Sequence, residues 1–132
     1  MATRSRIGIE NQDGTVTSIY CHWDGAPDTN GVILKEHYSD RERVEKLIAL
    51  GSLSSLAPEI DPTGEHSFEK PQSGITVAYH RDRGEDLMQS IKPSTKRYFE
   101  DVGNGWEAYG YLFTKQGEWI YGEAGRKGQV TL

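Results

Sequence analysis

Two short runs of aromatic, basic and acidic residues hold most of the side chains that could do chemistry. The first run is Tyr20-Cys21-His22-Trp23-Asp24-Gly25, and the second is Tyr79-His80-Arg81-Asp82-Arg83-Gly84. Each run is expected to end a β-strand at a glycine. Few of these side chains bury apolar surface, so the runs cost folding stability. A pocket for a planar, charged small molecule is the function that best explains such a composition.

The first run offers a polar face and an apolar face. Alternation along a strand puts Tyr20, His22 and Asp24 on one side and Cys21 and Trp23 on the other. His22 and Asp24 could present a donor–acceptor pair, although a structural, hydrogen-bonded histidine is the more common case. Metal sites need three or four ligands, and the other histidines lack the spacing, so no metal or cofactor is expected. Cys21 faces away from His22, which favours core packing over thiol catalysis.

The second run contains two arginines that could clamp a phosphate. A guanidinium group offers forked donors that match phosphate oxygens. If the run is extended, Asp82 points away from Arg81 and Arg83, so both arginines could reach one ligand. A solvated charge run at a strand end is an equally common explanation.

The elements that must position these residues follow from hydrophobic periodicity and turn signals. We expect strands at residues 4–11, 15–24, 75–80, 106–114 and 118–121, and helices at 30–38, 40–50 and 95–102. Asp13-Gly14 indicates a hairpin turn, and Ser94 can cap the last helix. Residues 58–74 are expected to form a mobile loop, and residues 84–93 are ambiguous. The prediction is a single α+β domain over 1–132, with an antiparallel sheet of about four to six strands and two or three helices packed on one face.

Composition limits the function further. The formal net charge is −5, which argues against binding a nucleic-acid polymer, because that needs a cationic face. Cys21 is the only cysteine, so no intramolecular disulfide forms, and a reducing compartment is expected. The chain has no apolar leader and no apolar run long enough to cross a membrane, which predicts a soluble cytoplasmic protein.

Several stretches resemble a family of small proteins from tailed phages. They are residues 2–8, 18–25, 37–38, 44–51, 54–56 and 77–85, and the Tyr-Cys-His-Trp-Asp-Gly run is the most specific. The family is similar to one that contains phage anti-CBASS sponges, which sequester cyclic dinucleotides such as 3′,3′-cyclic GMP–AMP and so silence a bacterial alarm. Residues 26–28 depart from the pattern, because many relatives have an aromatic residue there.

The resemblance implies a phage-encoded immune-evasion protein that acts in the host bacterial cytosol and binds its nucleotide without cleaving it. Residue chemistry and the resemblance together predict the ligand-binding residues Arg4, Ser5, Tyr20, His22, Trp23, Tyr79, Arg81 and Arg83, and no catalytic residue. A twofold-symmetric ligand would suit a homodimer. The aromatics after residue 105 are expected mostly in the core, with one or two available to stack on a base.

Two other function classes remain open. A nucleotide-degrading enzyme would use His22, Asp24 and His80 as acid–base groups or metal ligands. A protein-binding inhibitor of a host defence effector would instead use an exposed aromatic patch.

Overall fold

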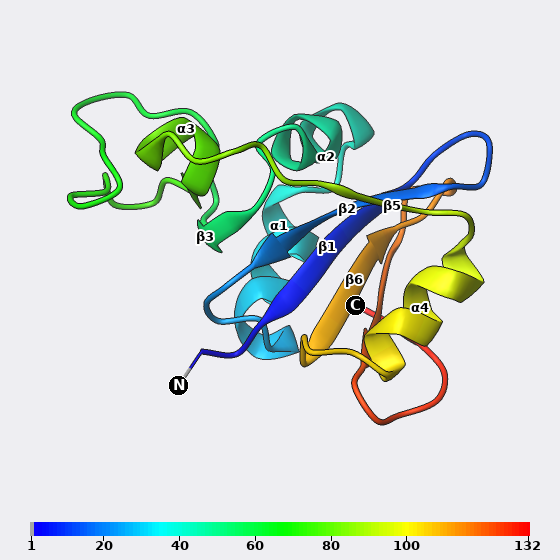
Figure 1. Cartoon of the computed structure of the whole chain (residues 1–132). Helices are drawn as coiled ribbons and strands as arrows, with labels where there is room; N and C mark the ends of the chain where they lie inside the picture. Colours follow the sequence, from blue (N-terminus) through cyan, green and yellow to red (C-terminus); the bar gives the residue numbers. More distant parts are fainter. Residues whose placement is uncertain (1) are drawn as a thin grey trace.

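The computed structural model describes residues 2–132, and all of its strands belong to one sheet (Figure 1). The strands are β1 (Ser5–Glu10), β2 (Val16–Cys21), β3 (Leu53–Ser55), β4 (Val77–Ala78), β5 (Ser90–Lys92), β6 (Tyr109–Phe113), β7 (Trp119–Glu123) and β8 (Val130–Thr131). The helices are η1 (Pro27–Gly31, a π-helical turn), α1 (Val32–His37), α2 (Arg41–Ile48), α3 (Tyr79–Arg83) and α4 (Thr95–Gly103). The α+β class is confirmed, with more strands than predicted.

The sheet is mixed rather than antiparallel, which corrects the prediction. Its order is β4-β3-β2-β1-β6-β7-β8, and β5 pairs with β2 beside β3. The pairs β1–β6 and β2–β3 are parallel, and the others are antiparallel. A parallel pair needs a crossover connection, and α1 and α2 supply it between β2 and β3.

Helices cover both faces of the sheet, so the prediction that they pack on one face is wrong. Ile7, Ile9 and Ile19 project to the face that carries α1 and α2, where they pack with Val44 and Leu47. The opposite face carries α4 (Figure 1), whose apolar side chains form a second cluster: Val16, Tyr98, Phe99, Val102 and Leu112. Residues that alternate along β1, β2 and β6 are therefore buried on both sides of the sheet.

Local signals explain the elements that match the prediction. The β1–β2 turn is held by the Asp13 carboxylate, which accepts from the Thr15 N–H at 3.0 Å. Ser94 caps α4, and its hydroxyl accepts from the Arg97 N–H at 3.1 Å. Gly51 follows α2 with a φ of 76°, a left-handed conformation that glycine adopts without strain.

The predicted strand at 75–80 is shorter than expected. Strand β4 contains only Val77 and Ala78, and α3 begins at Tyr79. The Asp82 carboxylate accepts from the Ala78 N–H at 2.8 Å, which turns the chain into the helix. The ambiguous stretch 84–93 contains the edge strand β5.

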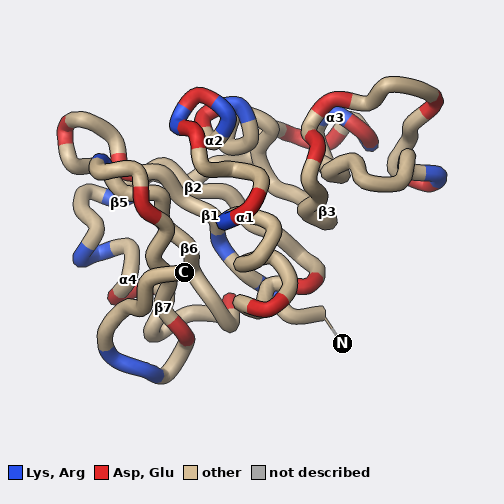
Figure 2. Tube along the Cα trace, turned by 180° about the vertical axis from the view of Figure 1, so that it is seen from behind, with Lys and Arg blue, Asp and Glu red and all other residues tan. Residues whose placement is uncertain are grey.

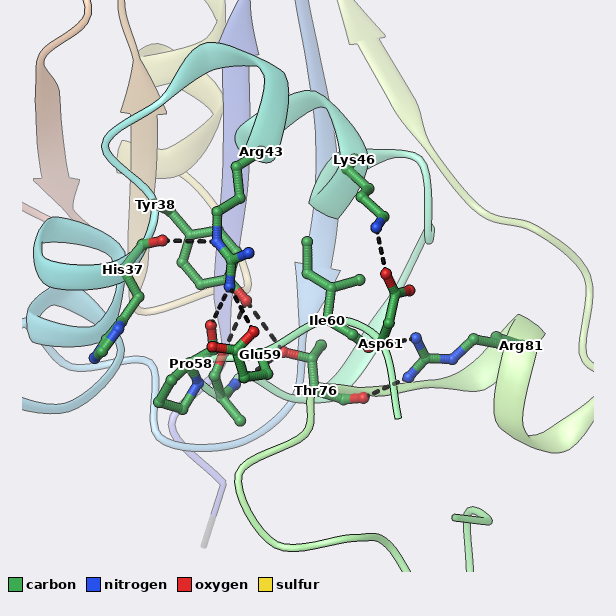
Figure 3. Close-up of polar contacts among 11 residues, drawn as sticks. His37, Tyr38, Arg43, Lys46, Pro58, Glu59, Ile60, Asp61, Thr76 and Arg81 are labelled. Carbon is green, nitrogen blue, oxygen red and sulfur yellow. Dashed lines mark hydrogen bonds and ion pairs between the residues drawn. The ribbon is translucent and has the colours of Figure 1, made fainter. Parts of the chain in front are cut away.

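The start of the predicted loop 58–74 is fastened to α2. The Arg43 guanidinium donates to the Pro58 carbonyl at 2.5 Å, and Lys46 forms an ion pair with Asp61 (Figure 3). Figure 2 shows charges of both signs along the outer side of α2, from which these contacts come. Within residues 2–132, no helix has the length and apolar character needed to cross a membrane.

Candidate functional site

The β1–β2 register decides which predicted residues share a face. Arg6 pairs with Tyr20, and Ser5 pairs with Cys21. Because side chains alternate, Arg6 and Tyr20 project toward the α4 face, and Ser5 projects toward the core under α1. Ser5 is fully buried there, and a Cβ on Gly25 would lie 2.8 Å from the Ser5 Cβ. Ser5 therefore lies on the opposite side of the sheet from Tyr20, apart from the predicted site residues of the first run.

Four aromatic rings gather at the end of β2, and we call them the aromatic ledge: Tyr20, His22, Trp23 and Trp106. Tyr20 stacks on Trp106 with 5.6 Å between ring centroids and 24° between planes. The Tyr20 hydroxyl lies 2.7 Å from His22 Nδ1, and the edge of Trp23 meets His22 at 4.6 Å. Trp106 is 67% exposed and Trp23 is 44% exposed. The ledge is therefore an aromatic surface open to solvent.

Trp23 departs from its predicted place on the core-like face. Strand β2 ends at Cys21, so the alternation that would bury Trp23 stops before it. Asp24 then takes a φ of 59°, which turns the backbone away from the sheet. The indole is left against His22 at the surface.

A cavity of about 340 Å³ lies beside the ledge, and we call it the sheet pocket. Its lining residues are Arg6, Tyr20, Ser52, Met88, Gln89, Ser90, Trp106 and Glu107. Arg6 forms an ion pair with Glu107 at 3.2 Å, and its Nε donates to the Ser18 hydroxyl at 3.1 Å. Both charged side chains of the pair are largely buried. The pocket thus offers a stacking wall beside a compensated charge pair.

The cation nearest the ledge is Arg4. Its guanidinium carbon lies 4.3 Å from the centroid of the Trp106 ring, and its buried Nε has no hydrogen-bond partner. Within residues 2–132, no acidic side chain pairs with Arg4. Burial raises the pKa of the Tyr20 hydroxyl, an effect that Arg4 partly opposes, so this hydroxyl keeps its proton and can donate to His22. Arg4 can therefore offer donors to a ligand anion.

The Arg81 guanidinium donates to protein groups, whereas the predicted phosphate clamp requires donors that are free for a ligand. Its Nη1 donates to the Ile60 carbonyl and its Nη2 to the Thr76 carbonyl, each at 2.6 Å (Figure 3). Its Nε donates to Asp82 at 2.8 Å. The run is helical, so Asp82 lies against Arg81 instead of pointing away from it. Arg81 thus joins both ends of the loop to α3.

Asp82 is the centre of this buried cluster. Burial opposes its ionisation, but hydrogen bonds from Arg81, the Ala78 N–H and His66 outweigh burial and lower the pKa of the carboxyl group. His66 Nε2 lies 3.1 Å from Asp82, and His66 Nδ1 accepts from the Gln72 N–H at 3.0 Å. The cluster holds the middle of the loop as well as its ends.

Arg83 and Tyr79 form a separate group at the surface. The Arg83 guanidinium lies 4.2 Å from the Phe68 ring centroid and 5.1 Å from that of Tyr79. Arg83 also pairs with Glu85. The Tyr79 N–H donates to the Ser52 carbonyl at 3.2 Å, and Ser52 lines the sheet pocket. The second run therefore lies beside the pocket, while its two arginines contact other residues.

Of the residues that line the sheet pocket, sequence reasoning assigned only Tyr20 to the site, and it missed Arg6, Trp106 and Glu107 among others. The signal for Arg6 was present, because Ile7 and Ile9 facing the core require Arg6 to face the other side. Trp106 was expected inside a strand, but it lies in the turn between α4 and β6. A second cavity, between α4 and the loop that joins β7 to β8, was also not indicated by any motif.

Thiol and metal chemistry depend on where Cys21 and the imidazole and carboxylate groups lie. Cys21 is fully buried, and burial raises the pKa of its thiol to about 12. Within residues 2–132, no group of three His, Cys, Asp or Glu side chains is arranged to hold a metal ion.

Comparison with protein-family models, with curated proteins and with solved structures finds no significant match for this chain.

Proposed function

We propose that this protein binds a nucleotide at the aromatic ledge and sequesters it without cleaving it. The observation that carries the proposal is the Arg4 guanidinium, which has no acidic partner among residues 2–132 and lies against the exposed Trp106 at the edge of the sheet pocket. A free cation beside an open aromatic face suits a ligand that joins a phosphate to a planar base. The resemblance to phage sponges gives the ligand class, a cyclic dinucleotide of a bacterial defence system.

Each part of such a ligand has a matching group. Tyr20 and Arg4 leave two thirds of the Trp106 surface accessible, so a base can stack on the open side of the indole. Arg4 can donate to a phosphate oxygen, and Glu107 can accept from an exocyclic amino group. Sequestration requires affinity alone, and these contacts supply it by stacking and hydrogen bonding.

The size of the pocket bears on stoichiometry. About 340 Å³ is near the lower end of the range for small-molecule sites, and it suits one nucleoside unit. A cyclic dinucleotide carries two bases, so we propose that two copies of the chain engage one ligand, each copy through its own ledge. A closed dimer around a twofold ligand is the simplest such arrangement.

The test is a thermal-shift and calorimetric screen of the full chain against cyclic dinucleotides, cyclic trinucleotides and ADP-ribose derivatives. A ligand that binds the folded state raises the melting temperature by mass action. Each mixture is then heat-denatured, and the released nucleotide is analysed by chromatography. We expect one class to bind, to be recovered intact, and to saturate at one ligand per two chains.

Variants locate the binding. Trp106→Ala removes the stacking surface and should weaken binding about tenfold or more, because base stacking contributes roughly 1–3 kcal/mol. Arg4→Gln should weaken it comparably. Ile91→Ala and Arg97→Gln are matched controls, since both remove an exposed side chain outside the sheet pocket and should bind like the parent. Altered nucleotide after incubation would instead support a degrading enzyme.

A protein-binding inhibitor is the second candidate, because apolar side chains are exposed around the same pocket. Met88, which lines the pocket, is 59% exposed, and Trp106 is 67% exposed. A screen in which no nucleotide binds, together with a stable complex with a host effector that Trp106→Ala disrupts, would favour this candidate over sequestration.

A further inference from the structure

A second cavity lies along the flank of α4, and we call it the α4 cleft. Its volume is about 600 Å³, which is within the range for small-molecule sites. One wall comes from α4 and the residue after it, at helical spacing: Thr95, Lys96, Phe99, Glu100, Gly103 and Asn104. The other wall is the stretch 126–129 of the β7–β8 loop. The cleft therefore runs the length of the helix, roughly 13 Å.

The walls are unusually cationic for a chain with a net charge of −5. Lys96, Arg126 and Lys127 line the cleft, against a single carboxylate, Glu100. Arg126 pairs with Glu123 at 2.8 Å, but within residues 2–132 neither Lys96 nor Lys127 has an acidic partner. Figure 2 shows a short blue stretch in the loop beside α4, with a red segment next to it. Lys96 and Lys127 lie on opposite walls of the cleft, where like charges repel one another and a bound anion would offset that repulsion.

The start of α4 adds to the positive character. No acidic residue lies in its first turn, although the positive end of a helix dipole favours one there. Instead the first turn carries Lys96. The nearby Glu10 carboxylate accepts from the Thr95 hydroxyl at 3.3 Å and from the Lys115 N–H at 3.0 Å. This end of the helix is less stable than it would be with an acidic residue, and a bound anion offsets that.

The middle of the cleft is apolar and roomy. Phe99, whose side chain is mostly buried, lines it. Gly103 and Gly128 lie on opposite walls, and a Cβ at either position would meet no atom within 4 Å. There is therefore space between the walls for the body of a ligand as well as for its charged group.

We propose that the α4 cleft is a binding site for a small organic anion, a phosphate or carboxylate attached to a flat or apolar body. Lys96 and Lys127 hold the anionic group, and Phe99 packs against the body. The α4 cleft shares no lining residue with the sheet pocket, so the two sites are independent. The proposal holds whether or not a nucleotide binds at the aromatic ledge.

The test is a ¹H–¹⁵N NMR titration of the full chain with phenyl phosphate, phenylacetate, inorganic phosphate and benzyl alcohol. We expect saturable shifts at the amides of Lys96, Gly103, Gly128 and Gln129 with phenyl phosphate, phenylacetate or both. Comparison of these two probes distinguishes a phosphate site from a carboxylate site. Inorganic phosphate lacks the body and benzyl alcohol lacks the charge, so each should bind at least about fivefold more weakly than the better aromatic anion.

Three substitutions test the charges. Lys127→Gln should weaken binding of the better probe about tenfold, which is about 1.4 kcal/mol, because one of the two lysines that hold the anionic group is lost. Glu100→Gln should tighten it, because the only carboxylate in the wall is lost. Lys35→Gln, an exposed lysine of α1 outside the cleft, is the matched control and should leave binding unchanged. Non-saturable shifts, shifts confined to the sheet pocket, or equal affinities for Lys127→Gln and Lys35→Gln would overturn the proposal.

Discussion

Arg81 has either a structural role or a role in a phosphate clamp, and the Arg81→Ala substitution distinguishes the two. The substitution removes the two donors from which the carbonyl oxygens of Ile60 and Thr76 each accept a hydrogen bond at 2.6 Å. It also leaves the Asp82 carboxylate, whose side chain is only 4% exposed, without its guanidinium partner. We therefore expect a large loss of stability and little direct effect on ligand binding.

The magnitude follows from these contacts. Removing one partner of a buried ion pair costs roughly 3–5 kcal/mol, and a hydrogen bond from a charged donor is worth roughly 1.5–3 kcal/mol. Asp82 keeps two other donors, Ala78 N–H and His66, and the Arg81 side chain is 25% exposed, so the lower end applies. We expect the free energy of unfolding to fall by about 3 kcal/mol, which corresponds to roughly 10 °C in the melting temperature.

Urea unfolding followed by tryptophan fluorescence measures this loss by linear extrapolation. Arg83→Ala is the matched control, because its side chain is 50% exposed and its partner Glu85 is 46% exposed. An exposed pair contributes less than about 1 kcal/mol. If Arg81→Ala unfolds at the same urea concentration as Arg83→Ala yet no longer binds the nucleotide that the parent binds, the structural role is wrong and the clamp is right.

Two further predictions concern the core. Gly110→Ala should lower the free energy of unfolding by about 2 kcal/mol, because the new Cβ would lie 2.3 Å from a Val102 methyl group where α4 packs on β6. Gly103→Ala should not lower it, because a Cβ at Gly103 meets no atom within 4 Å. Equal urea midpoints for the two variants would refute the packing. The Cys21 thiol should resist iodoacetamide in the folded protein and react on unfolding. Because the pKa of this thiol rises from 9.0 to about 12 on folding, the free energy of unfolding should fall as the pH rises through that interval. Rapid alkylation of the folded chain would contradict both expectations.

The elements that the sequence predicted well are those set by local chemistry. The β1–β2 hairpin follows from alternation and from Asp13-Gly14, whose side chain and left-handed glycine build the turn. Helix α4 begins where Ser94 can cap it and presents Tyr98, Phe99 and Val102 to the sheet. In both cases the residues that determine the element lie within it or next to it.

The elements that the sequence did not predict depend on distant partners. β1 is parallel to β6, more than a hundred residues along the chain, and no local pattern specifies that pairing. Strand β4 stops early because Asp82 bonds back to the Ala78 N–H, in competition with the strand ladder. That cap is worth more here because Arg81 and His66 fix the same carboxylate.

The candidate site shows the same difference between residues that a local pattern predicts and residues that depend on distant contacts. Tyr20 and His22 were found from the alternation predicted for residues 15–24, although β2 itself ends at Cys21, and Arg6 could have been found from alternation within β1. Trp106 has no local signal, because only the packing of the turn after α4 against β2 brings its indole onto Tyr20. Arg81 was misjudged for the opposite reason, since its chemistry suits a phosphate but its donors are already bonded to the loop.

The distribution of charge around the sheet pocket constrains how a nucleotide can bind there. Arg6 is neutralised by Glu107 at 3.2 Å, so the interior of the pocket has little net attraction for a phosphate. A phosphate placed there would also approach the Glu107 carboxylate, which repels it. Arg4 lies at the ledge instead, against Trp106, with no acidic partner among residues 2–132. The phosphate of the proposed nucleotide would therefore lie outside the pocket at Arg4. Its base would lie inside, where the Glu107 carboxylate can accept hydrogen bonds from an amino group.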